Sequence, residues 1–272
     1  MLRLLTPRWK SRAAAALASL ICLGLAGCGS DDKNPGRPGT GGQNPPAAQF
    51  DQAMAVAQSQ ASAVQAVTLV ESMATLAGGV GKTAGVDAGK NYGWSEENQR
   101  WEYDYEYAAG GTTYHWFYWV QYLDDDGIPQ QSALGAASVN HSMTGIGHYL
   151  QQIEAATITY DYTYFYGSNI TGMGTGTLLL NGDGGYDFDY NYSSPSFNMD
   201  QAFAVTWEIQ PPGISRGATG GCPTGTVRCE FPPYYSVVTF NGTGTATSTL
   251  YDASGNAVAG GGSVHTLACT TR

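Results

Sequence analysis

Basic side chains are scarce in this chain of 272 residues, which holds 12 Lys and Arg against 22 Asp and Glu. The formal net charge is −10 at pH 7. A strongly anionic surface repels phosphate backbones and anionic lipid headgroups. We therefore expect no nucleic-acid partner and no direct binding to lipid headgroups.

Long hydrophobic runs are also missing. The uncharged stretch from Ala13 to Leu25 is shorter than the ~20 residues that a membrane-spanning helix needs. Small residues follow it, and four basic residues precede it: Arg3, Arg8, Lys10 and Arg12. A basic start, a short apolar core and small residues are typical of a cleavable secretory signal. We assign residues 1–27 to a signal peptide.

The tetrapeptide Leu25-Ala26-Gly27-Cys28 at the end of this segment resembles the lipobox of bacterial lipoproteins. The resemblance covers the export segment alone. It implies that Cys28 becomes the first mature residue and carries acyl chains such as palmitate, which together anchor a protein stably to a membrane. Gly29 stands where an aspartate often marks inner-membrane retention in this class, so the resemblance favours the outer membrane. The alternative is an ordinary signal peptide with a chance cysteine.

Few cysteines remain once the signal is removed and Cys28 is acylated. An exported chain meets an oxidising environment, so we expect a disulfide among Cys222, Cys229 and Cys269. The short spacing and Pro223 favour a loop closed by Cys222 and Cys229, with Cys269 as a competing partner. Four of the basic residues also leave with the signal, so eight face 22 acidic ones, and the mature net charge is −14.

Glycine and proline divide the mature chain. They are abundant in residues 28–49, which we interpret as the lipidated cysteine and a disordered tether. They are absent between Phe50 and Leu76, which predicts an amphipathic helix over 50–77, ended by the glycines that follow. Its expected apolar stripe begins with Phe50, Met54, Ala57, Ala61 and Val64.

Aromatic and acidic residues alternate after the helix, which is typical of strands with one buried face. Tyr103 and Tyr105 point to one side, Glu102 and Asp104 to the other, and Gly110-Gly111 turns the chain. The alternation recurs in 114–122, 160–166 and 186–192. Weaker strands are expected near 134–150, 171–180, 199–209, 235–250 and 257–268, with a turn at Asn181-Gly182 and a long loop over 211–234.

These elements predict a mainly β fold over residues 50–272, as one domain. We expect an antiparallel β-meander curled into a barrel or half-barrel, with the N-terminal amphipathic helix packed on it. Exported half-barrels such as the lipoprotein-sorting carriers, and lipocalin-type barrels, have a comparable architecture. No motif is shared with either class, so the comparison concerns architecture alone.

The chain is rich in rings, with 18 Tyr, 6 Trp and 8 Phe. Tyrosine buries its ring well but needs water or a partner for its hydroxyl. The rings could form the core and cross-strand pairs of the sheet. Alternatively, some could line a concave pocket for an apolar ligand or sugar rings. The candidates for such a pocket are Tyr103, Tyr105, Trp116, Tyr118, Tyr162 and Tyr164.

Catalytic motifs are absent from the mature sequence, which has no Gly-x-Ser-x-Gly elbow and no Ser-x-x-Lys. No zinc spacing occurs, and His141 and His148, seven residues apart on a strand, fall on opposite faces. We therefore expect no metal and no cofactor. Carboxylates such as Glu102 and Asp187 could pair in sugar hydrolysis, but acids that alternate with rings are typical of a solvated strand face.

The sequence thus favours a membrane-anchored lipoprotein of the cell envelope that binds an apolar or carbohydrate ligand without catalysis. A structural or assembly component that docks on other envelope proteins is the first alternative. A carboxylate-dependent glycoside hydrolase is the second. Whether the chain is an enzyme stays open, with the balance against it.

Overall fold

The computed structural model describes residues 50–77, 92–218 and 220–269. The signal peptide, Cys28 and the tether predicted from the sequence lie outside these residues. Within them, one helix is followed by 13 strands. The helix is Gln52–Ala77 (α2), and the strands are Tyr92–Ser95 (β1), Arg100–Ala109 (β2), Thr112–Leu123 (β3), Pro129–Gln130 (β4), Ser138–Ile153 (β5), Ala156–Thr171 (β6), Thr177–Ser193 (β7), Asn198–Ile209 (β8), Ile214–Gly217 (β9), Thr224–Phe231 (β10), Tyr234–Asn241 (β11), Thr245–Tyr251 (β12) and Ser263–Thr266 (β13).

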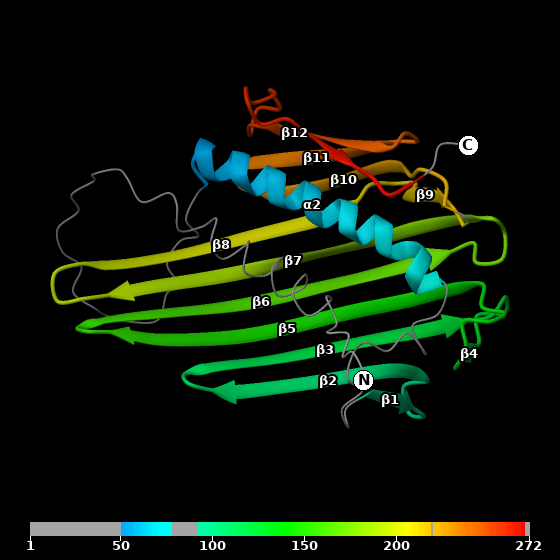
Figure 1. Ribbon diagram of the computed structural model, residues 1–272, viewed down its shortest axis with the longest axis horizontal. Helices are drawn as coiled ribbons and strands as arrows, with labels where there is room; N and C mark the ends of the chain where they lie inside the picture. The colour runs from blue at the N-terminus through cyan, green and yellow to red at the C-terminus, as the bar shows by residue number, and fades with distance from the viewer. Residues whose placement is uncertain (1–49, 78–91, 219, 270–272) are drawn as a thin grey trace, which may run out of the picture.

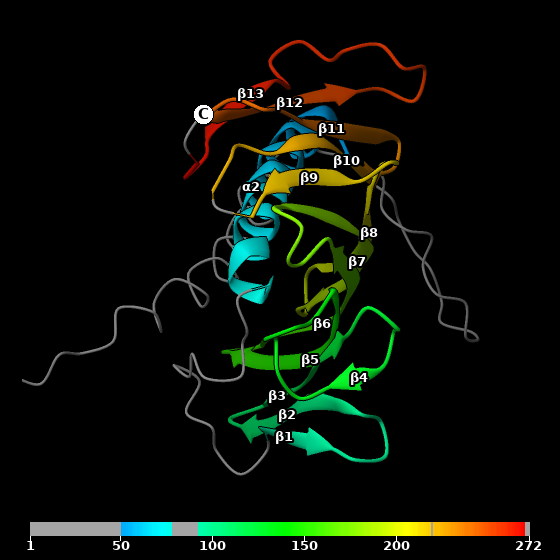
Figure 2. The ribbon, with the colours of Figure 1, turned by 90° about the vertical axis from the view of Figure 1, so that its right-hand side faces the viewer.

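The strands form one antiparallel sheet in the order β1-β2-β3-β5-β6-β7-β8-β10-β11-β12-β13. The short strand β4 pairs with β3, and β9 pairs with both β7 and β10. Figure 1 shows α2 lying diagonally across one face of this sheet, and Figure 2 shows the sheet curling beside the helix. The mainly antiparallel β fold with one packed helix is therefore confirmed.

Helix α2 begins at a capping aspartate, since the N–H of Met54 donates to Asp51 Oδ1 at 2.8 Å. Its extent agrees with the prediction, but its predicted apolar stripe agrees only at Phe50 and Val70, which are buried. Val64, placed on that stripe, is 53% exposed. Small side chains face the sheet instead: Ala55, Ser59, Ser62, Ala63 and Ala66 are buried. Small residues let the helix approach the sheet closely, and periodicity among many alanines did not identify this face. No helix in the described ranges is both long and apolar enough to cross a bilayer.

The predicted turn at Asn181-Gly182 is wrong, because β7 continues through it. The chain turns earlier, at Gly172, Gly174 and Gly176, which all have positive φ. Gly182 is needed for close approach across strands, because a Cβ there would lie 2.6 Å from the Cβ of Ser168. The Gly110-Gly111 hairpin is confirmed, with φ values of 60° and 80°.

The segment 211–234 is not the long loop that its glycines and prolines suggested. It contains β9 and β10, and β10 pairs with β11 along its whole length from Thr224 to Phe231. Alternating buried residues such as Val227, Cys229 and Phe231 explain this strand. The glycines and prolines on either side of β10 obscured the short alternation of buried and solvent-facing residues within it.

The apolar core lies between α2 and the strands β10, β11 and β12. Val238, Phe240 and Leu250 are almost fully buried there. The core continues under the C-terminal half of the helix to the ends of β5, β6 and β7, where Val139 and Ile170 are buried. At the opposite ends of β2, β3, β5 and β6 the strands extend beyond the helix (Figure 1).

Candidate ligand-binding face

The rings predicted to line a pocket lie on one side of the sheet, which is also the side that α2 partly covers. Strand pairing places Tyr103 opposite Tyr118 and Tyr105 opposite Trp116. The centroid of the Trp116 ring lies 6.0 Å from that of Tyr162. We call this side the ring face and the other side the polar face.

The sixth predicted residue, Tyr164, lies on the same face. Its ring centroid is 6.1 Å from that of Trp116, because both residues pair with Gly145 of the strand between them. The structure thus brings all six candidate residues together on β2, β3 and β6. Their predicted role in binding stays a prediction.

Two glycines of β5 determine how the rings lie. A Cβ on Gly145 would come within 2.6 Å of the Trp116 ring, and one on Gly147 would meet the Tyr162 ring even more closely. The rings therefore cover the bare backbone of β5, as aromatic side chains often do for glycines in sheets.

The rings continue beyond the predicted set. Tyr107 and Tyr114 stack with centroids 4.8 Å apart, and Tyr149 and Tyr160 stack at 4.7 Å. Tyr107 is 40% exposed, so this end of the ring face is open to solvent. The alternation already placed Tyr107 and Tyr114 on the ring face. The contribution of Tyr149 depends on the register between β5 and β6, which the sequence alone did not provide.

Four phenols of the ring face stay protonated at neutral pH. Burial raises the pKa of Tyr164 to about 12, and burial also raises the pKa of Tyr118 above its ordinary value. Desolvation raises the pKa of Tyr103 and Tyr162 in the same direction. These hydroxyls can therefore donate and accept hydrogen bonds to a ligand, and they are not poised as bases or nucleophiles.

A buried histidine lies at the side of the ring face nearest the core. His141 is 1% exposed, and its Nε2 contacts the hydroxyl of Ser168 while its Nδ1 lies 3.3 Å from the hydroxyl of Tyr166. Burial lowers the pKa of His141 to about 4. No carboxylate of the described residues contacts this imidazole in the hydrogen bonds and ion pairs that the structure shows. A neutral histidine between two buried hydroxyls is best explained as a satisfied core group.

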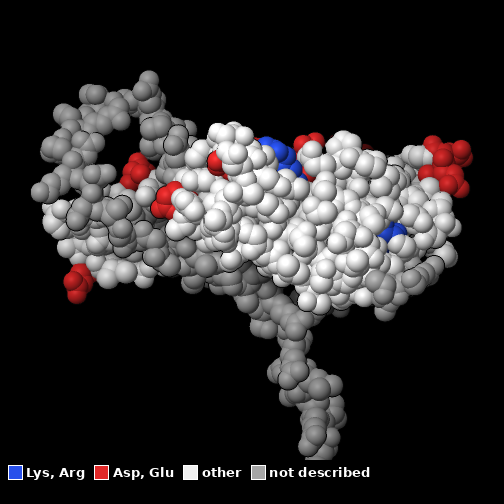
Figure 3. All heavy atoms as spheres, turned by 90° about the horizontal axis from the view of Figure 1, so that it is seen from above, with Lys and Arg blue, Asp and Glu red and all other residues white. Residues whose placement is uncertain are grey.

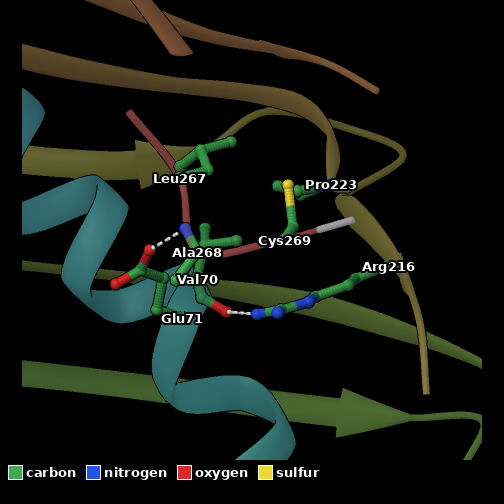
Figure 4. Close-up of a pocket in the computed structure, with 7 residues that line it drawn as sticks. All are labelled: Val70, Glu71, Arg216, Pro223, Leu267, Ala268 and Cys269. Carbon is green, nitrogen blue, oxygen red and sulfur yellow. Dashed lines mark hydrogen bonds between the residues drawn. The ribbon is translucent and has the colours of Figure 1, made fainter. Parts of the chain in front are cut away.

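Two small spaces lie beside α2. One cavity of about 60 Å³ lies between α2 and the sheet, where Leu69 faces Tyr164, Trp207 and Cys229. A second crevice near the end of the helix is narrower (Figure 4). There Arg216 donates to the carbonyl of Val70. Pockets for drug-sized ligands occupy about 300–1,000 Å³. Both spaces are smaller than that, and the end of the ring face that carries Tyr105 and Tyr107 is open to solvent.

The carboxylates suggested for hydrolysis point away from the rings. Glu102 and Asp104 are next to ring-face residues in the chain and so project from the polar face, as does Asp187. On that face, Asp104 contacts His115 at 2.5 Å and Asp161 contacts His148 at 2.6 Å. His141 and His148 are on opposite faces, as predicted. No group of three potential metal ligands occurs among the described residues.

The predicted Cys222–Cys229 disulfide is wrong. Cys222 pairs with Cys269, with Cα atoms 5.0 Å apart, and Cys229 is a free, buried thiol. Cys229 is an inward residue of β10, and burial raises its pKa to about 11. Because the loop that the short spacing suggested is a strand, the nearest cysteine in sequence points into the core. The competing partner that the sequence left open is the one used.

Comparisons of the chain with protein-family models, with curated proteins and with solved structures found no match.

Proposed function

We propose that this protein is an envelope lipoprotein, anchored through Cys28, whose ring face binds a carbohydrate chain without catalysing its hydrolysis. One observation carries the proposal: rows of half-exposed Tyr and Trp rings cover glycines on an open sheet surface. Trp116 over Gly145 and Tyr162 over Gly147 are the central members of these rows.

A carbohydrate suits this surface better than an apolar ligand does. An apolar molecule gains most from enclosure, whereas Tyr105 and Tyr107 of the ring face are 36% and 40% exposed. A sugar ring stacks its C–H face on an aromatic ring and keeps its hydroxyls in water or hydrogen bonded. The protonated phenols of Tyr103 and Tyr162 can supply such hydrogen bonds beside the stacking rings.

The positions of the carboxylates support the part of the proposal that excludes hydrolysis. A glycoside hydrolase needs two carboxyl groups on either side of the scissile bond, ~5 to 10 Å apart. The acids of β2 and β7 project from the polar face, across the sheet from the rings. A glycan lying on the ring face would not reach them.

The binding proposal is tested with purified mature protein that carries Cys28→Ser. Titration calorimetry against a panel of envelope oligosaccharides measures binding in wild type, Trp116→Ala and Phe117→Ala. Phe117 is the adjacent ring on the polar face, so it is a matched control. We expect Trp116→Ala to weaken binding about tenfold, since an aromatic stacking contact contributes ~1 kcal/mol beyond its buried area. Phe117→Ala should bind like wild type.

Equal effects of the two substitutions, or no binding to any glycan, would reject the ring face as a glycan site. Mass spectrometry of organic extracts of the same protein separates the apolar alternative. A lipid recovered in stoichiometric amount would show that the rings bind an apolar ligand instead.

The anchor is tested separately. Cys28→Ser should move the protein from the membrane fraction to the soluble fraction of lysed cells. If the variant sedimented with membranes as wild type does, the lipid anchor would be wrong, whatever the ring face binds.

A further inference from the structure

One long strand edge is unpaired over half of its length among the described residues. β8 pairs with β7 from Asn198 onward, but β10 covers only Thr206–Ile209 of its other side. Figure 1 shows β8 extending well beyond the end of β10. Pro232 and Pro233 follow β10 and turn the chain back into β11, so no strand of the described ranges continues along β8. We call residues 198–205 the open edge of β8.

The direction of the backbone groups on this edge follows from the pairing. In an antiparallel pair, alternate residues direct their N–H and C=O groups to the partner strand and away from it. The hydrogen bond from Ser194 N–H to the carbonyl of Phe197 closes the β7–β8 hairpin and sets this alternation. The N–H of Gln210, which donates to Thr226 of β10, agrees with it. Outward-directed N–H and C=O groups therefore belong to Asn198, Asp200, Ala202 and Ala204.

Carboxylates without cations surround the open edge on the polar face. Asp187 and Asp189 of β7 lie opposite Ala204 and Ala202, and Asp200 lies on the edge itself. Burial, together with Asp161, Asp200 and Asp187, raises the pKa of Asp189. No described Lys or Arg forms an ion pair with these three aspartates. Figure 3, which views the molecule from above, also shows few basic side chains among scattered acidic ones.

The basic residues of the described chain are engaged elsewhere. Arg100 pairs with Glu102 at 2.7 Å, Arg228 pairs with Glu230 at 2.6 Å, and Arg216 donates to a helix carbonyl. The acidic surplus at β8 therefore has no internal partner within the described residues.

The ring face of the same edge is mostly apolar, with Met199, Phe203 and Val205 beside a single polar residue, Gln201. The Phe203 ring lies 5.3 Å from that of Phe50, which lies 5.4 Å from Phe231. An added strand would place alternate side chains beside Phe203 and the intervening ones beside the aspartates. A strand that pairs with this edge would therefore need apolar side chains toward the ring face and basic side chains toward the polar face, in alternation.

We propose that the open edge of β8 binds an extended peptide segment of a partner protein in which basic and apolar residues alternate. Such a segment would add an antiparallel or parallel strand to the sheet, with main-chain hydrogen bonds to Asp200, Ala202 and their neighbours. The basic residues would lie beside Asp187, Asp189 and Asp200. The apolar residues would extend the Phe203 cluster.

A second copy of this chain fits the edge less well. The other long edge, that of β2 beyond β1, carries Asp104 and Glu106 beside its outward backbone groups. Pairing two open edges would place carboxylates against carboxylates, which opposes association. The charge of the edge therefore selects a basic partner over self-pairing.

The test uses the full mature protein with Cys28→Ser and fluorescent octapeptides that alternate Lys with Val, or Glu with Val. Anisotropy titrations should show binding of the Lys peptide and at least tenfold weaker binding of the Glu peptide. Hydrogen exchange should slow at the amides of Asn198, Asp200, Ala202 and Ala204 when the Lys peptide is bound. A Lys peptide N-methylated on the amides of one edge should also bind at least tenfold more weakly.

Matched proline substitutions separate strand addition from a general attraction of charges. Ala202→Pro removes an outward N–H of the open edge, and Ala108→Pro makes the same change on β2. We expect at least a tenfold loss of binding for the first and no change for the second. The N-methylated peptide keeps the test valid if Ala202→Pro does not fold.

Three outcomes would overturn the proposal. They are equal binding of the methylated and unmethylated Lys peptides, equal binding of the Lys and Glu peptides, and concentration-dependent self-association that protects the β8 amides without peptide. Trp116→Ala should leave peptide binding unchanged. That result would keep the strand-addition proposal independent of glycan binding at the rings.

Discussion

The two ends of the ring face differ in what covers them. Beneath α2, the inward residues of β10, β11 and β12 are apolar or small, including the buried Ser236 and Ser248, and Val238 and Phe240 are at most 2% exposed. At the far ends of β2 and β3 the inward residues are tyrosines, with Tyr105 and Tyr107 at 36% and 40% exposure. One sheet face therefore carries a sealed core and an open aromatic surface.

The difference shows that alternation and side-chain type carry separate information. Period-two alternation identifies the inward positions along both ends. Whether those positions are sealed depends on whether the side chains tolerate water. Tyrosine does so through its hydroxyl, whereas Val, Leu and Phe do not. Tyrosine also occurs beneath the helix where its hydroxyl has a partner, since the hydroxyl of Tyr186 donates to Oε1 of Gln58 in α2 at 2.8 Å.

Truncating one ring in each region should give the largest difference in stability between the sealed core and the open aromatic surface. Phe240→Ala removes a ring that is 2% exposed and should destabilise the protein by about 3–5 kcal/mol. Tyr105→Ala removes a ring that water already reaches and should cost about 1 kcal/mol or less. Urea denaturation followed by circular dichroism measures both. Similar costs would show that the tyrosine end is as tightly packed as the core.

The disulfide should stabilise the covered end alone. It joins residues 47 apart, so opening it with Cys222→Ser and Cys269→Ser should cost about 4 kcal/mol of loop-closure entropy. Amide exchange should accelerate in β11–β13 and stay unchanged in β2 and β3. Thiol titration of the denatured, unreduced Cys28→Ser protein should count one thiol, that of Cys229. Two further thiols would contradict the pairing.

Acid should lower the stability of the protein through His141, which lies between the two regions. Its folded pKa of about 4 lies below the ordinary 6.5, so the unfolded chain binds the extra proton first. Its contribution to stability is complete above pH 6.5 and is lost as pH falls toward 4, by about 2 kcal/mol between pH 7 and pH 5. His141→Gln should remove this part of the pH dependence, measured by urea midpoints at both pH values.

Adding one methyl group under a ring should have the smallest effect. Gly145→Ala pushes a Cβ against the Trp116 ring, which can shift toward solvent, and should cost about 1–2 kcal/mol. Gly167→Ala is the control, because its Cβ would meet nothing within 4 Å. That substitution should be neutral or slightly stabilising in urea denaturation. A neutral Gly145→Ala would show that the ring does not rest on β5.

The sequence predicted the helix, the strand alternation and the shared face of Trp116 and Tyr162, because these depend on local periodicity. It did not predict what depends on pairing between distant segments. The register that brings Tyr149 to Tyr160 is one example. The choice of Cys269 as the partner of Cys222 is another, since it depends on the placement of β13 beside β12.

The turn prediction from composition was wrong where a glycine allows close packing between strands and does not form a turn. Gly182 lies inside β7 and marks a close contact with Ser168 of β6, while the turn lies at the glycines before β7. The helix shows a related effect, since alanine on every side obscured which face was buried. In both cases the small residue is present because of a neighbour that is distant in sequence.

The Cys222–Cys269 bond closes residues 222–269 into a covalent ring. This ring includes the exposed turn at Asp252–Gly255, where a protease would have ready access. A single cut there would open the backbone but leave both fragments joined through sulfur. The domain would then keep all of its strands after such a nick, and the fragments would separate only when the bond is reduced and the fold is lost.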